Sequence, residues 1–180
     1  MPTHVVAEAH GDERGALLSF LEAQRGGVRR AVLGLTEEQV VERPSASELS
    51  LFGLVKHVAQ VEENWLAIAA GSPGPLDAEK FGRSFEREDD ETLAGVLAYW
   101  ERTAKETDEF LRAVPSLDDT FALPEAPWFP PDARQSMRWL ALHLIEEVAR
   151  HAGHADIVRE SLDGKTAFVL VDEERKAREG

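Results

Sequence analysis

Apolar residues recur every three to four positions in four long segments, and this spacing restricts the possible fold more than any other feature. Side chains at this spacing lie on one face of an α-helix. The sequence shows no internal repeat and no convincing sheet, so we predict an all-α four-helix bundle. The four segments run from residue 12 to 34, from between Ser47 and Ser50 to Ala70, from 91 to 114, and from 133 to 162.

Two long connections separate the predicted helices, at residues 71–90 and 116–132. Connections of this length are unusual in bundles, and both contain aromatic residues, so we expect them to cover a site. After the turn at Asp163-Gly164, residues 166–171 are β-prone or form a docking segment, and the charged tail should fray. We therefore predict one domain at 1–165 and a C-terminal extension at 166–180.

Composition excludes several classes of function. A chain of 180 residues suits a single domain. Its net charge of −14 makes nucleic acid and anionic membranes poor partners. The absence of cysteine rules out disulfides and thiolate metal sites within the chain. No apolar run is long enough to span a membrane, and no signal peptide is evident at the N-terminus, so we expect a cytoplasmic protein.

The fourth predicted helix concentrates the groups that can bind a metal or move a proton. Residues 138–160 contain His143, His151 and His154, which are three of the six histidines. Glu147 precedes His151 by four residues, so the two side chains lie one above the other on a helix. This face is close to the apolar side of the helix, where an unpaired carboxylate would be costly.

His57 lies in the middle of the second helix, in LFGLVKHVAQVEENW. Taken alone, it could be a core histidine, and Glu147 could be an ordinary solvated carboxylate. Together with His151 they form a set of two imidazoles and one carboxylate, which suits zinc, and also nickel, iron or manganese. Three protein ligands leave a position open, which is typical of a catalytic site.

The segments LFGLVKHVAQVEENWL and HLIEEVARHAGHADIVRE resemble the DinB/YfiT-like superfamily of metal-binding four-helix bundles. The chain looks most like the actinobacterial branch of mycothiol-dependent maleylpyruvate isomerase-like and mini-circle proteins, over residues 12–165. The resemblance implies one metal ligand from the second helix and two from the fourth, which here are His57, Glu147 and His151. Many members have histidine at the position of Glu147, whereas the isomerase-like branch has glutamate.

Other residues have two interpretations. His154 falls where many members have glutamine; it is either structural, or it orients a metal ligand or moves a proton. His143 is predicted to be a packing or surface residue. Tryptophans are usually core residues, but we expect Trp65 and Trp128 to line a pocket.

Three functions are compatible with these features. The resemblance favours a metal-dependent thiol S-transferase that uses a low-molecular-weight thiol, mycothiol, to attack an electrophile. We do not expect isomerase activity, because the maleylpyruvate isomerase has a further C-terminal domain that contributes to its active site. The alternatives are a metal-dependent hydrolase with water as the nucleophile, and a non-catalytic metal-binding bundle or dimerisation module that forms a homodimer.

Overall fold

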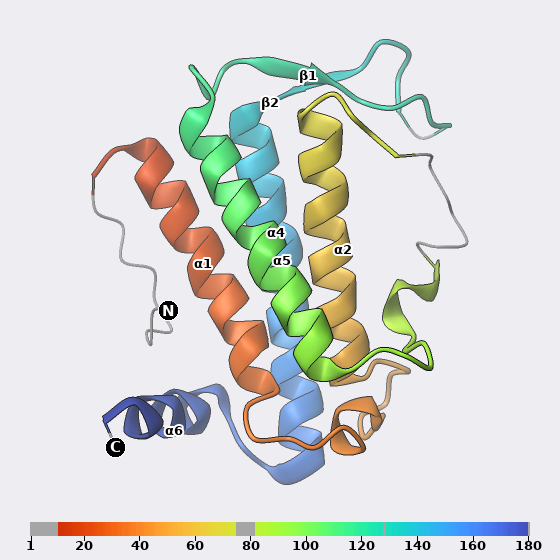
Figure 1. Cartoon of the computed structure of the whole chain (residues 1–180), viewed down its shortest axis with the longest axis vertical. Helices are drawn as coiled ribbons and strands as arrows, with labels where there is room; N and C mark the ends of the chain where they lie inside the picture. Colours follow the sequence, from red (N-terminus) through yellow and green to blue (C-terminus); the bar gives the residue numbers. More distant parts are fainter. Residues whose placement is uncertain (1–10, 75–81, 128, 180) are drawn as a thin grey trace.

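Four long helices form a bundle, which confirms the all-α prediction (Figure 1). The computed structural model describes residues 11–74, 82–127 and 129–179. Helix α1 packs mainly against α5, and α2 packs against both α4 and α5. The long helices are α1 (Glu13–Ala31), α2 (Leu51–Ala69), α4 (Leu93–Ala113) and α5 (Met137–Asp163), and two short 3-10 turns are η1 (Gln39–Val41) and η2 (Arg83–Phe85).

Each long helix begins after a residue whose side-chain oxygen accepts a hydrogen bond from the backbone N–H three positions later. Such a bond satisfies one of the N–H groups that the first turn of a helix leaves without a partner. At the other end of α5, Gly164 adopts the left-handed conformation (φ 78°), as the predicted turn requires. The four capping residues are Asp12, Ser50, Thr92 and Ser136.

The second long connection contains a small antiparallel sheet, so the expectation of no sheet is wrong there. Strands β1 (Thr120–Ala122) and β2 (Arg134–Ser136) pair with Phe121 opposite Gln135. Strands of three residues are too short to show a period of two in the sequence. Because β2 occupies the positions just before Met137, α5 begins four residues later than predicted. The sheet lies over one end of the bundle (Figure 1).

The segment predicted as β-prone is instead the start of a helix, α6 (Ala167–Glu179), and the charged tail continues it. The alternative prediction, that residues 166–171 dock onto the bundle, agrees better with the structure. Leu170 is 1% exposed, and the Arg30 side chain of α1 lies 3.5 Å from Glu174. Local β propensity is a weak preference that packing of this kind overrides. Figure 1 shows α6 extending sideways from the end of the bundle opposite the sheet, beside the end of α1.

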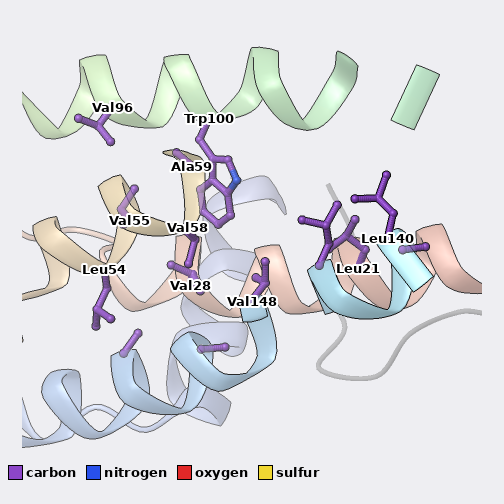
Figure 2. Packing of buried hydrophobic residues seen from close by; sticks show 14 of the residues in the cluster. Leu21, Val28, Leu54, Val55, Val58, Ala59, Val96, Trp100, Leu140 and Val148 are labelled. Carbon is purple, nitrogen blue, oxygen red and sulfur yellow. The ribbon is translucent and has the colours of Figure 1, made fainter. Parts of the chain in front are cut away.

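A buried ion pair joins three of the helices. Both oxygens of the Glu62 carboxylate in α2 accept hydrogen bonds from Arg25 of α1, and one also accepts from Trp100 Nε1 of α4 at 2.9 Å. Arg25 also contacts Asp108 at 3.0 Å. Figure 2 shows Trp100 pointing from α4 towards Ala59 and its neighbours in α2. These bonds offset the cost of burying the carboxylate and fix α2, which carries His57, against α1 and α4.

Among the helices in the described ranges, none is long and apolar enough to cross a membrane. The expected division into a domain at 1–165 and an extension at 166–180 stays a prediction.

Candidate metal centre

The structure brings His57, Glu147 and His151 together between α2 and α5. One potential ligand atom from each lies within 4.8 Å of the other two. Within α5, Glu147 Oε2 is 3.7 Å from His151 Nε2, as expected for residues one turn apart. The rings of His57 and His151 are nearly perpendicular, with centroids 4.7 Å apart. In the described part of the chain, no other group of three or more His, Asp or Glu side chains is close enough to share an ion.

Burial keeps both imidazoles neutral near pH 7. His57 is 3% exposed and His151 is 7% exposed. Burial is the main reason that the pKa of each falls from 6.5 to about 4; the nearby His151 adds to the effect on His57, and His154 and Arg150 add to the effect on His151. Neutral imidazole is the form that binds metals, so the protein need not release a proton from either ring. With the carboxylate of Glu147, the donor set fits zinc or a similar divalent ion.

His57 is held by the connection that follows α2. Its Nδ1 lies 2.8 Å from Ser84 Oγ, and the Phe85 ring stacks on it with a centroid separation of 3.9 Å. Gly53, one turn before His57, allows this approach. A Cβ atom at Gly53 would lie 2.2 Å from the Phe85 carbonyl oxygen, which is closer than two such atoms can come. The connection therefore sits directly on the backbone of α2.

Lys56 of α2 binds a later part of the same connection. Its buried ammonium group donates a hydrogen bond to the Glu86 carbonyl oxygen and contacts the Glu91 carboxylate, both at 2.9 Å. We expect this connection to cover the site, and Phe85 does lie on the His57 ring. Phe81 lies outside the described residues. The described part of the connection is thus held against α2 at Gly53, Lys56 and His57.

Two residues of the cluster, Glu147 and His151, border a void between α2 and α5. The void is too narrow to admit a water molecule. Glu62 faces it, but its carboxylate is already bonded to Arg25 and Trp100. A small molecule therefore cannot reach the cluster through this void. The void is lined by Val58, Val61, Glu62, Leu144, Glu147, Val148 and His151.

His154 lies one turn beyond His151 and is half-buried. Its Nδ1 is 3.4 Å from Nδ1 of His151. Because Nε2 of His151 faces Glu147, Nδ1 points away from the potential ion towards His154. This position is compatible with orienting His151, and that role stays a prediction.

The structure describes one of the two tryptophans that are predicted to line a pocket. Trp65 packs edge-on against Trp139, with centroids 5.1 Å apart, and against His143, 4.7 Å apart. His143 also stacks on Trp139 at 4.6 Å, which agrees with the packing interpretation of this histidine. Trp65 does not line the void beside the cluster, and its pocket role stays a prediction. Trp128 lies outside the described residues.

Sequence reasoning missed Ser84 and Glu62. Ser84 lies in a connection without periodicity, and no pattern points from it to His57. Glu62 is followed directly by Glu63, and only the three-dimensional position of Arg25 distinguishes the two carboxylates. Phe85 carried a usable signal, because a phenylalanine in a polar loop tends to fold back over a core or a pocket.

Comparison with known proteins agrees with the fold. A family model described as mycothiol-S-transferase matches residues 16–164, a range that contains all three residues of the cluster. No curated protein matches the chain. A conserved protein from Enterococcus faecalis, known from its crystal structure, has a similar fold, with a TM-score of 0.63 and 13% identity. The alignment covers 87% of this chain and 100% of that chain, and at this identity the likeness concerns the fold alone.

Proposed function

This chain belongs to the mycothiol-S-transferase family, and we propose that it transfers mycothiol to an electrophilic small molecule at a divalent-metal centre. The observation that carries the proposal is the convergence of His57, Glu147 and His151 within the family-matched region. Two neutral imidazoles and a carboxylate form the donor set of many catalytic zinc sites. Nickel, iron and manganese accept the same ligands, and zinc is our first choice.

Each residue has a distinct part in this proposal. His57 and His151 would hold the ion through ring nitrogens that are neutral near pH 7, and Glu147 would supply a negative charge. A divalent ion held there would act as a Lewis acid that lowers the pKa of a small thiol and so favours the nucleophilic thiolate.

The surroundings support the same chemistry. The narrow void on the core side keeps water away from the buried face of His151. On the far side of this ring, His154 Nδ1 is placed to accept a hydrogen bond from His151 Nδ1–H and so to hold the ring in orientation. In the reaction the thiol sulfur would form a bond to the electrophilic carbon while the bond from that carbon to its leaving group breaks. The leaving group would depart with the bonding electron pair, and the thiol proton would pass to solvent or to the leaving group.

Metal content is the first test. Purified wild-type protein should contain one divalent ion per chain by elemental analysis, and Glu147→Ala and His151→Ala should lose it. Glu146→Ala is the matched control, because Glu146 is an exposed neighbour that pairs only with Arg150 at 3.2 Å among the described residues. If the wild type contains no stoichiometric ion, and alanine is tolerated at all three cluster positions, the protein is a non-catalytic bundle.

Activity is the second test. Metal-loaded protein should conjugate mycothiol to a generic electrophile faster than the uncatalysed reaction, and His57→Ala should not. The proposal is wrong if the loaded wild type gives no conjugate above background. Turnover of esters or amides without any thiol would instead identify a hydrolase that uses the same centre with water as the nucleophile.

A further inference from the structure

The contact between Ser84 and His57 is the feature of the centre that the proposed function does not explain. Ser84 belongs to η2, 27 positions after His57, and is 2% exposed. Its hydroxyl oxygen lies 2.8 Å from Nδ1 of His57. A buried hydroxyl at this distance from a ring nitrogen is a full hydrogen bond.

The direction of this bond depends on the form of the histidine ring, because a serine hydroxyl can either donate to a bare Nδ1 or accept from Nδ1–H. A neutral imidazole carries its single proton on either Nδ1 or Nε2, and the hydrogen bond made by one nitrogen determines whether the other can bind a metal. A serine hydroxyl can accept the Nδ1–H of His57 through an oxygen lone pair. With the proton on Nδ1, Nε2 keeps the lone pair that a ligand atom needs.

We infer that Ser84 is a positioning residue, which holds His57 with its proton on Nδ1 and its Nε2 available to the cluster with Glu147 and His151. The inference adds a residue role to the proposed metal centre, and this role rests on the proposed function. It concerns a property of the metal-free ring, however, and can be tested separately.

The backbone around Ser84 is fixed well enough for this role. Phe85 stacks on one face of the His57 ring at 3.9 Å with an interplanar angle of 17°, which opposes ring rotation. The absence of a side chain at Gly53 lets the Phe85 carbonyl lie against α2. Lys56 holds the next residue, Glu86, through its carbonyl oxygen. Ser84 is therefore presented to His57 by a segment attached to the same helix as His57.

The experiment compares wild-type protein with Ser84→Ala, which removes only the hydroxyl. Ser161→Ala is the matched control, because the Ser161 hydroxyl is exposed and bonds within α5 to the Ile157 carbonyl. Zinc affinity is measured by competition with a chromophoric chelator. Ser84→Ala should bind zinc about 10- to 100-fold more weakly, the usual effect of removing a residue that orients a metal-bound histidine. Ser161→Ala should match the wild type.

A spectroscopic measurement separates positioning from general stability. Nitrogen NMR of the imidazoles near pH 7.5 reports which ring nitrogen of His57 carries the proton. Metal-free wild-type protein should show Nδ1–H for His57, and Ser84→Ala should shift the ring towards a mixture of both forms. Ser161→Ala should leave the spectrum unchanged.

Two results would overturn the inference: a wild-type His57 protonated on Nε2, or a Ser84→Ala variant with the wild-type tautomer and unchanged zinc affinity. These results are distinct from a failure of the proposed function. If the wild type binds no zinc, the proposed function fails, and the tautomer of the metal-free ring still decides whether Ser84 holds His57. If zinc and mycothiol transfer are both present and Ser84→Ala is unaffected, only the inference about Ser84 fails.

Discussion

Without a bound metal, the protein should lose stability in mildly acidic solution because of two buried rings. His57 and His151 titrate near pH 4 in the folded chain, chiefly because burial disfavours their charged forms. In the unfolded chain the same rings titrate near pH 6.5. Between these values the unfolded state binds more protons, so the free energy of unfolding falls as pH decreases through this window and is constant above it.

The size of the effect follows from the two pKa values. Between pH 7 and pH 5 each ring lowers the free energy of unfolding by about 2 kcal/mol, because it is largely protonated in the unfolded chain and neutral in the folded one. The two rings together contribute about 4 kcal/mol. For a domain of this size that corresponds to a fall in Tm of about 8–16 °C. Few carboxylates titrate in this range, which makes it better suited to the test than lower pH.

The assay is urea unfolding of chelator-treated protein at pH 7, 6 and 5. The single variants His57→Gln and His151→Gln should each reduce the pH dependence by about 2 kcal/mol, and the double variant should remove both contributions. Proton NMR of the wild type should place both ring titrations below pH 5. The reasoning is refuted if metal-free wild type is equally stable at pH 7 and pH 5, or if the double variant keeps the full pH dependence.

Three further predictions concern the packing around the cluster and its metal. Glu62→Gln should lower the free energy of unfolding by about 3–5 kcal/mol in urea unfolding, since the buried Arg25 loses its one fully buried carboxylate partner and keeps only partly exposed ones. Glu109→Gln, which breaks an exposed pair, should cost no more than about 0.5 kcal/mol. Gly53→Ala should destabilise the protein by about 1–3 kcal/mol and weaken zinc binding, because a Cβ would displace the Phe85 backbone; unchanged calorimetric and zinc titrations would contradict this. Zinc at 100 times its Kd should raise the free energy of unfolding by about 2.7 kcal/mol, and a chelator should reverse the gain in a thermal melt; Glu147→Ala should show no such gain.

The sequence was sufficient to predict the four long helices and the placement of Glu147 and His151 on one helix face. Helix periodicity is a local signal, and a residue pair four apart on one helix, such as Glu147 and His151, is close whatever the rest of the fold does. The pairing of this face with His57 depends on how two distant helices pack. The ligand types of the three residues suggested it, and the resemblance to a family supported it.

The parts that sequence reasoning missed are those that depend on contacts between segments. The bond from Ser84 to His57 exists because η2 lies on α2, and that approach depends on the missing side chain of Gly53. The burial of Glu62 depends on Arg25 from another helix. The helical state of residues 167–179 depends on Leu170 docking onto the bundle. None of these contacts produces a periodic pattern in the amino-acid sequence.

The separation of the cluster over two helices has a consequence during protein synthesis. A nascent chain that has emerged only through α4 offers His57 alone, since Glu147 and His151 belong to α5. One imidazole binds a divalent ion weakly compared with three joined ligands. If the cluster binds an ion as proposed, the ribosome must complete α5, and this helix must pack against α2, before the protein can compete for that ion with other cellular ligands. Incomplete chains would stay without metal, and metal content would mark finished molecules.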